Sequence, residues 1–250
     1  MRRLFLLYPN RTRRLLEIAI PLTSWVIITM PLWLSFWHPA LVAYLIITFD
    51  VYWFYKSVTL VFFALRSFVT FTAHIAVNWL DQAKALPHYP DLWHVVIIPE
   101  YNEPVHILKR TLENLTKQDF PKERLIIVLA TETKDSNSIA TAATLKEEYG
   151  SVFGHFLVTQ HTLKPGEIAG KSSNMAWAAR QVARYLKTNK IPLEWTTITS
   201  CDADALPHPK YFSALSYQFL KDSDRYDHFY QGSIMFYNNI WRIPLPNRFL

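Results

Sequence analysis

The stretch Trp195–Asp204 reads Trp-Thr-Thr-Ile-Thr-Ser-Cys-Asp-Ala-Asp, a β-rich run that ends in two carboxylates. Its β-branched and aromatic residues favour a strand over Trp195–Cys201. In an extended backbone, residues i and i+2 point to the same side, so Asp202 and Asp204 can face one ligand together. Hard carboxylate oxygens at a strand end suit a divalent cation that keeps open positions for phosphate oxygens.

A second interpretation of these carboxylates needs no ligand. Asp is a good helix cap, and Pro207 and Pro209 lie just before the apolar stretch Tyr211–Leu220. Asp202 and Asp204 would then belong to a helix-entry loop. The Asp-x-Asp pair alone leaves both interpretations open, and the segments upstream have to decide between them.

Upstream of this stretch, strand and helix signals alternate. Strands are predicted over Trp93–Ile98, Leu125–Leu129 and Phe156–Gln160, and helices over about Pro104–Lys117, Ser138–Tyr149 and Lys171–Leu186. We expect Asn102 to cap the first helix, and Ala176, Ala179, Ala183 and Leu186 to share one face of the third. Such alternation predicts an α/β domain with a mostly parallel, Rossmann-like sheet that is covered on both faces and binds its ligand at the carboxyl ends of the strands.

Polar side chains follow each predicted strand at that edge. They are Pro99-Glu100-Tyr101-Asn102-Glu103 after the first, Glu132 and Asp135 after the second, Lys171 beyond the third, and Asp202 and Asp204 after the fourth. Because parallel strands end at the same edge of a sheet, we expect these residues to meet around one ligand.

The charge of the chain is unevenly distributed. Residues 1–86 hold 8 Lys/Arg and 3 Asp/Glu (net +5), whereas residues 87–250 hold 18 and 17 (net +1). The near-neutral second part argues against nucleic acid as a partner, because nucleic-acid-binding domains carry basic stripes. Cys201 is the single cysteine, so no intrachain disulfide can form and nothing indicates an oxidising compartment.

The first part of the chain is typical of a membrane anchor. Five arginines precede the apolar stretch Leu15–Trp37, which is long enough to cross a hydrocarbon core of about 30 Å and too long for a signal peptide. A turn at His38-Pro39 leads into a second apolar run, Leu41–Tyr55. We expect a transmembrane hairpin (residues 1–56) in the inner or plasma membrane, with the arginines and the rest of the chain in the cytoplasm.

Residues 57–90 are predicted to form an interfacial amphipathic helix and a linker. Polar residues recur every four positions between Arg66 and Asn78, with large apolar residues between them. A third spanning helix over Ser57–Val77 is the alternative. Pro87 and Pro90 mark the linker, after which residues 91–250 form the α/β domain.

Three short motifs give the α/β domain a family resemblance. Ile97–Glu103 resembles the opening IIPxYNE signature of family-2 glycosyltransferases with the GT-A fold, and Gly170–Asn174 resembles the Lys-small-small-Asn element of their membrane-bound polysaccharide synthases. Asp202-Ala203-Asp204 stands where that family keeps its metal-binding Asp-x-Asp. With the hairpin, the chain looks like the membrane-embedded branch that includes cellulose and hyaluronan synthases.

The resemblance implies an inverting, metal-dependent transfer of sugar from a nucleotide sugar to a glycan or lipid acceptor, with a UDP-sugar as the expected donor. It implies nucleotide-sugar-binding roles for Pro99, Tyr101, Glu103, Lys171 and Asp202, and it implies that Asp204 together with Asp202 binds Mn²⁺ or Mg²⁺. The second strand departs from the family, since Ala130-Thr131-Glu132 replaces the usual Asp-Asp-Gly. We expect Glu132 to bind the base in place of the acid that the family has here. The plainer roles are packing for Tyr101, a first-turn carboxylate for Glu103 and a solvated cation for Lys171.

A second departure concerns catalysis. The family's Thr-Glu-Asp-like base motif and its Gln-x-x-Arg-Trp acceptor element do not occur after Asp204. We therefore name no catalytic residue and expect this chain to be the donor-binding N-terminal portion of a longer enzyme, with Gly232–Ile243 as a strand and turn leading onward.

Three other functions can be weighed against a glycosyltransferase. Gly166–Ser172 nearly spells a P-loop, but it has three residues between its glycines where four are required, and it does not directly follow a strand. A dinucleotide dehydrogenase is disfavoured because no Gly-x-Gly-x-x-Gly follows any predicted strand. A membrane-tethered, non-catalytic nucleotide-sugar-binding module remains as the alternative.

Overall fold

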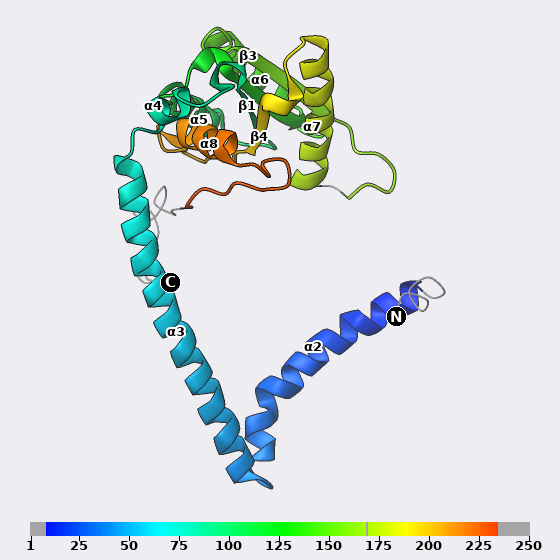
Figure 1. Ribbon diagram of the computed structural model, residues 1–250. Helices are drawn as coiled ribbons and strands as arrows, with labels where there is room; N and C mark the ends of the chain where they lie inside the picture. Colours follow the sequence, from blue (N-terminus) through cyan, green and yellow to red (C-terminus); the bar gives the residue numbers. More distant parts are fainter. Residues whose placement is uncertain (1–8, 169, 235–250) are drawn as a thin grey trace. The chain divides into compact units, whose positions relative to one another are not determined.

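The computed structural model describes residues 9–168 and 170–234, and the chain divides into two compact units, residues 1–73 and 74–250. The first unit consists of α2 (Pro9–Leu34) and most of α3 (Pro39–Ala76), joined by a short turn (Figure 1). The second unit is an α/β domain. The predicted continuation of this domain over Gly232–Ile243 lies largely outside the described residues, and Gly232–Ile234 form no regular element.

Both long helices carry mostly apolar side chains, with a few charged residues such as Glu17, Asp50 and Arg66 among them. Two candidate membrane spans, Asn10–Leu34 and Pro39–Ala76, have the required length and composition. Most of their large apolar side chains are exposed, and hydroxyls such as those of Ser24 and Thr48 donate to backbone carbonyls four residues earlier. Hydroxyls bonded in this way can lie in an apolar surrounding, because their polar atoms are satisfied within the helix.

The expected break between a second span and a separate helix at Ser57 does not occur. Helix α3 continues without interruption through Ala76, and at about 1.5 Å per residue its 38 residues measure about 57 Å. The segment holds no Gly or Pro after Pro39 that would end it, so the change from an apolar to a striped pattern leaves the helix intact. The third-span alternative likewise describes part of α3 and adds no further helix.

The end of α3 is tied to the α/β domain by Lys210. Its ammonium group donates hydrogen bonds to the carbonyls of Ile75 (2.6 Å) and Val77 (2.9 Å), which are left without partners where the helix ends. The next helix, α4 (Trp79–Lys84), is capped by Asn78 and packs against α8 (Tyr211–Lys221), with the Trp79 and Tyr217 rings 5.3 Å apart. The linker then forms a short 3₁₀ turn, Tyr89–Asp91.

The second unit is built on a fully parallel, four-stranded sheet in the order β3-β2-β1-β4. Its elements are β1 (Trp93–Pro99), α5 (Val105–Thr116), β2 (Leu125–Glu132), α6 (Ser138–Tyr149), β3 (His155–His161), α7 (Lys171–Thr188), β4 (Thr196–Ser200) and α8 (Tyr211–Lys221). The sequence predicted this alternation, including α6 at its observed bounds. Strand β2 runs three residues further than predicted and so carries Glu132 to the edge of the sheet.

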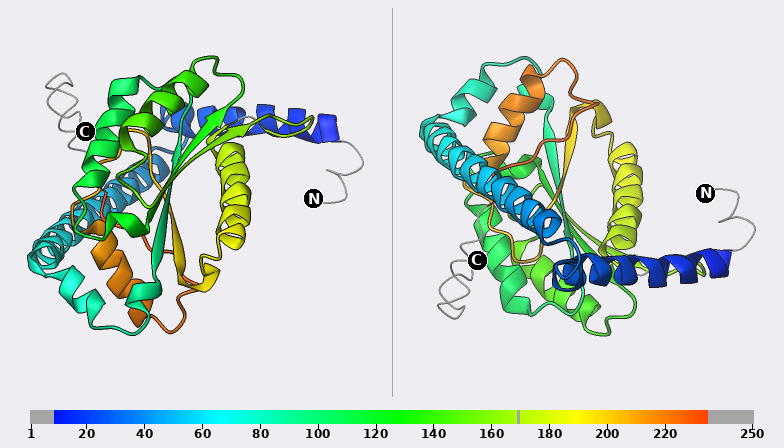
Figure 2. Two further views of the ribbon diagram at one scale, coloured as in Figure 1. Left: turned by 90° about the horizontal axis from the view of Figure 1, so that it is seen from above. Right: turned by 90° about the horizontal axis from the view of Figure 1, so that it is seen from below.

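Helices cover both faces of the sheet (Figure 2). On one face, α5, α6 and α8 enclose a core that includes Val96 and Ile98 of β1, whereas α7 covers the opposite face, where Val95 and Ile97 point. Strands β1 and β2 are buried on both sides, which explains their continuous apolar sequences. The buried row of α7 is Asn174, Ala178, Val182 and Leu186. Of the four residues predicted to share one face, Leu186 is buried and Ala179 packs against this core from a partly buried position, whereas Ala176 and Ala183 are exposed.

His94 joins three elements at the centre of the larger core. Its ring nitrogens lie 2.5 Å from the Thr197 hydroxyl of β4 and 2.8 Å from the Ser216 hydroxyl of α8. Complete burial, followed by the nearby charge of Arg124, lowers the pKa of His94 to about 3. The imidazole is therefore neutral at physiological pH and serves as a structural link between β1, β4 and α8.

Candidate nucleotide-sugar site

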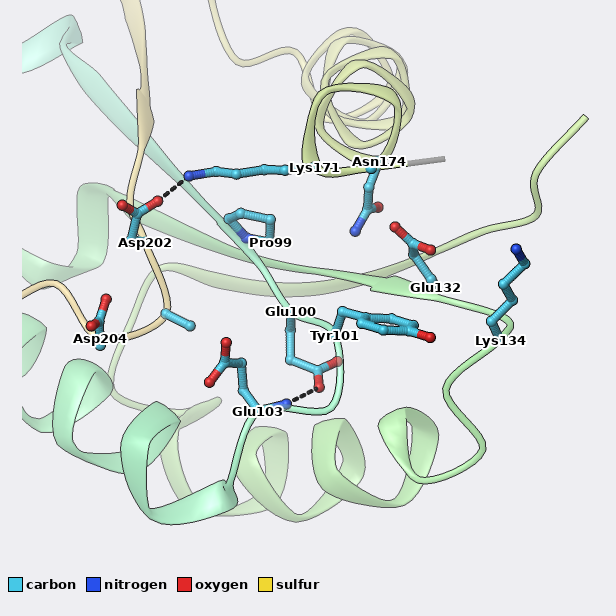
Figure 3. Close-up of a pocket in the computed structure, with 12 residues that line it drawn as sticks. Pro99, Glu100, Tyr101, Glu103, Glu132, Lys134, Lys171, Asn174, Asp202 and Asp204 are labelled. Atoms are coloured by element: carbon cyan, nitrogen blue, oxygen red, sulfur yellow. Dashed lines mark hydrogen bonds and ion pairs between the residues drawn. The ribbon is translucent and has the colours of Figure 1, made fainter. Parts of the chain in front are cut away.

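A pocket of about 530 Å³ opens at the carboxyl edge of the sheet. The strand order changes direction between β1 and β4, and in open α/β sheets such a switch point is where ligands bind. Figure 3 shows side chains from β1, β2, α7 and the turn after β4 around this space. The lining residues are Pro99, Glu100, Tyr101, Glu103, Glu132, Lys134, Gly170, Lys171, Asn174, Asp202, Ala203 and Asp204.

The Asp-x-Asp segment forms a turn just beyond β4. The Ala205 N–H donates to the Asp202 carbonyl at 3.0 Å, and the buried Ala203 carbonyl accepts from the Thr111 hydroxyl of α5 at 2.6 Å. Both carboxylates lie on the exposed side of this turn and line the pocket. The extended backbone expected at this point is thus replaced by a turn, but the shared orientation of Asp202 and Asp204 is kept.

The capping interpretation of these carboxylates is wrong. Helix α8 begins at Tyr211, and its N-cap residue is Lys210, which makes no side-chain capping bond. The chain between Asp204 and α8 is held by other bonds, including one from the Gln118 amide to the Pro207 carbonyl at 3.2 Å. Both carboxylates line the pocket, and neither residue is the N-cap of α8.

The beginning of α7 supplies positive charge to the pocket. Gly170 is the N-cap residue, with a φ of +150° that favours glycine, and Lys171 follows as the first helical residue. The Lys171 ammonium group forms an ion pair with the Asp202 carboxylate (Figure 3). A helix N-terminus with an adjacent lysine attracts anions through unpaired N–H groups and the helix dipole.

The loop after β1 is held in place by Asp135, a buried acid that follows β2. The Asp135 carboxylate accepts the backbone N–H groups of Asn102 (3.0 Å) and Asn137 (2.9 Å). To make this bond, Asn102 adopts a left-handed conformation with φ of +56°. The predicted helix cap at Asn102 was wrong, because Pro104 occupies the N-cap position of α5 and Asn102 turns the loop toward Asp135.

Glu100 is buried beneath this loop, with 3% of its surface exposed. Burial, followed by a hydrogen bond with Asp135, raises the pKa of Glu100 to about 7. Burial would also raise the pKa of Asp135, but the N–H groups of Asn102 and Asn137 outweigh it and the pKa is lowered. The protonated form of Glu100 is therefore favoured up to about pH 7, next to an ionised Asp135. The Glu100 Oε2 atom has no hydrogen-bond partner among the described residues.

The opposite end of the pocket combines an aromatic ring with hydrogen-bonding groups. Tyr101 has half of its surface exposed, and it lies near Glu132, Lys134 and Asn174 (Figure 3). The Asn174 amide nitrogen donates to the Ala130 carbonyl at 2.7 Å, which anchors the side chain to the end of β2. This end suits a flat, polar ring system such as a nucleobase.

No protein-family model matches this sequence, and no curated protein matches it. Among solved structures, the chain is similar to a mannosyltransferase, PcManGT from Pyrobaculum calidifontis, in complex with GDP-Man and Mn²⁺. The two chains are 21% identical with a TM-score of 0.34, and the match covers 52% of this chain and 32% of that chain. A likeness of this size carries no argument about activity, which has to rest on the pocket itself.

All the site residues named from the sequence line this pocket: Pro99, Tyr101, Glu103, Glu132, Lys171, Asp202 and Asp204. Glu100 was expected at this edge of the sheet but was given no role, Lys134 was missed, and Asn174 was noted only as part of a motif. A signal for Glu100 was available, because it follows Val96 and Ile98 at the same spacing and should point inward like them. Lys134 follows β2 in a polar loop and carries no comparable signal.

The two aspartates fit a hard divalent cation as part of a larger ligand set. Within residues 9–168 and 170–234, no group of three His, Cys, Asp or Glu side chains is arranged to hold a metal ion. Asp202 and Asp204 offer carboxylate oxygens, which Mn²⁺ and Mg²⁺ prefer, and a bound diphosphate would have to supply further oxygens. The arrangement thus favours a cation that enters together with a phosphorylated ligand.

Proposed function

We propose that this chain binds a nucleotide sugar through a divalent cation and forms the donor-binding part of a membrane-bound, inverting family-2 glycosyltransferase. The main support is that residues from three separate motifs lie around the same pocket. Residues of three separate motifs, near Tyr101, Lys171 and Asp202, line one pocket at the switch point of a parallel sheet.

The two ends of the pocket suit the two ends of a nucleotide sugar. Tyr101 and Glu132 would contact the nucleoside, and Glu103 would bind the ribose or base. Lys171, at the start of α7, would neutralise the diphosphate together with the helix N-terminus. Asp202 and Asp204 would hold Mn²⁺ or Mg²⁺.

The reaction would be a displacement at the anomeric carbon of the sugar. The bond from this carbon to the diphosphate oxygen breaks, an acceptor hydroxyl forms the new bond, and its proton passes to a base. A bound divalent cation supplies stabilisation of the charge that develops on the leaving diphosphate. The ammonium group of Lys171 acts on the same charge from the protein side. We assign the base to no residue of this chain.

Binding to the full chain tests the proposal directly. In detergent or nanodiscs, titration calorimetry with a nucleoside diphosphate should give Mn²⁺-dependent binding, and ligand and metal together should raise the melting temperature more than either alone. If no nucleoside diphosphate binds with or without metal, the proposal fails.

The release of nucleoside diphosphate from a nucleotide sugar separates an enzyme from the alternative, a membrane-tethered binding module. Release by the chain would support transferase chemistry. Binding of the intact donor without any release would favour the module.

A further inference from the structure

We propose that the end of the pocket formed by Tyr101, Glu132, Lys134 and Asn174 selects guanine as the base of the nucleotide donor. The proposal rests on the function proposed above, that this pocket binds a nucleoside diphosphate sugar. It replaces the uridine donor expected from the sequence and is argued from the hydrogen-bonding groups that these four side chains present.

Asn174 presents a buried acceptor to this end of the pocket. The residue has only 2% of its surface exposed, and its Nδ2 atom donates to the Ala130 carbonyl at 2.7 Å. Because a carbonyl can only accept, this bond fixes which end of the amide faces the strand. The Oδ1 atom is left without a hydrogen-bond partner among the described residues, although burial makes such an atom costly. A ligand N–H group would satisfy it.

Glu132 adds a second acceptor next to the first. The side chain of Ala130 faces α7, and Glu132 lies two residues further along β2, so it points to the same face. Figure 3 shows its carboxylate beside the Asn174 amide. Glu132 forms no ion pair with any residue in the part of the chain that the structure describes. Two acceptors side by side require a ligand with two neighbouring donors.

Lys134 supplies a donor on the far side of Glu132. It lines the pocket and extends from the loop that follows β2 (Figure 3). An ammonium group can donate but not accept. Along this wall, the pocket therefore offers a donor from Lys134, then acceptors from Glu132 and Asn174.

Guanine carries the complementary order of groups on its Watson–Crick edge. Its O6 atom accepts, while N1–H and the 2-amino group are adjacent donors. Lys134 would donate to O6, and Glu132 and Asn174 would accept from N1–H and the 2-amino group. The exposed Tyr101 ring would stack on the base. Stacking is similar for all bases, so the polar wall has to provide the discrimination.

The other common bases match this wall less well. Uracil has one N–H between two carbonyl oxygens, so one oxygen would face an acceptor. Adenine and cytosine each have an amino group next to a ring-nitrogen acceptor. With each of these bases, the acceptor of Glu132 or Asn174 would face another acceptor or remain without a hydrogen bond. Sites built on buried polar groups strongly reject ligands that fail to pair them.

Titration of the full chain with GDP, IDP and UDP in the presence of Mn²⁺ tests this proposal. IDP differs from GDP only by lacking the 2-amino group. We expect GDP to bind about tenfold more tightly than IDP, and at least about tenfold more tightly than UDP, since a good bidentate base contact contributes roughly 1–3 kcal/mol. UDP binding as tightly as GDP would overturn the guanine assignment and leave the proposed function standing. Equal affinities for GDP and IDP would also overturn it. No binding of any of the three would mean that the proposed function itself fails.

Two substitutions locate the selectivity. Glu132→Gln replaces one acceptor by a donor and should weaken GDP about tenfold, while UDP binds unchanged or more tightly. Lys134→Met should weaken GDP and IDP equally, because both carry O6. Glu147→Gln on the exposed surface of α6 is the matched control and should alter neither. Melting temperatures without ligand check that each variant folds. If Glu132→Gln lowered GDP and UDP binding by the same factor, the residue would not read the base.

Discussion

Lys171 and Asp202 form an ion pair across the mouth of the pocket, although one begins α7 and the other follows β4. About half of each side chain is exposed, at 52% and 62%. The pair joins the residue that we assign to the diphosphate with a residue that we assign to the metal. Removing Lys171 should therefore affect the two ligands in opposite directions.

We expect Lys171→Met to strengthen the binding of Mn²⁺ alone and to weaken nucleoside diphosphate. Without its partner, Asp202 is a more available anion for the cation. The diphosphate loses a charge-assisted hydrogen bond, and about a tenfold loss of affinity is expected. Calorimetric titrations with each ligand measure both effects. Lys187→Met, near the far end of α7, is the control. If Lys171→Met left the affinity for diphosphate unchanged, our assignment of the lysine would be wrong.

Asp204→Asn should remove the metal dependence of nucleotide binding. The substitution keeps the size of the side chain and suits a turn, since Asn is favoured in turns as Asp is. The melting temperature without ligand should therefore stay close to that of the wild type. A charged metal ligand is lost, and Mn²⁺ should no longer increase the affinity for a nucleoside diphosphate. Unchanged Mn²⁺ dependence in this variant would refute the metal assignment.

Glu100→Gln should flatten the pH dependence of stability between about pH 5 and 8. The pKa of Glu100 is raised from 4.5 to about 7, so the folded state binds more protons than the unfolded state in this window. Stability contributed by the protonated acid is fully present below pH 4.5 and is lost as pH rises through 7. The loss in the wild type is on the order of 2 kcal/mol.

The difference between wild type and Glu100→Gln isolates this contribution, because all other titratable groups are common to both proteins. Urea unfolding at pH 5, 6.5 and 8 gives the free energy of unfolding for each. The Gln amide keeps a donor toward Asp135 and never ionises. We expect the variant to gain stability relative to wild type as pH rises, and a constant difference would contradict the raised pKa of Glu100.

Cysteine labelling of intact cells tests the proposed membrane topology. A cysteine introduced at His38, in the turn between α2 and α3, should react with an impermeant maleimide from outside, and one at Gln160 should not. The native Cys201 gives little background, because it is buried and burial raises its pKa to about 12. Labelling at position 160 from outside would contradict a cytoplasmic α/β domain.

The α/β alternation was predictable because each element carries a local signal. The apolar run of β2 and the Gly150 that follows α6 mark their elements without reference to the rest of the chain. The continuity of α3 was not predictable from the pattern. A polar stripe after Ser57 indicates a change of surroundings, and it says little about whether the helix ends.

The pocket residues were predictable as a group, because parallel strands bring their carboxyl ends together. Which of these residues bond to one another could not be predicted. The bonds between Lys171 and Asp202, and between Asn102 and Asp135, join segments separated by a whole helix or more. Asn102 is an example. Its position before a helix predicts an N-cap, but its backbone N–H bonds to Asp135, which follows β2, and the residue adopts a left-handed conformation instead.

The pairing of β1 with β4 also has a consequence for the order in which the domain folds. His94 meets its partner Thr197 across a sequence separation of 103 residues, whereas Val96 of β1 already faces Ile127 of β2. Closing the longer loop costs more chain entropy, and β4 is a short edge strand with Ile198 53% exposed. We expect β1, β2 and β3 to assemble first and β4 to add last. A nascent chain would then possess the base-binding end of its pocket before it acquired Asp202 and Asp204.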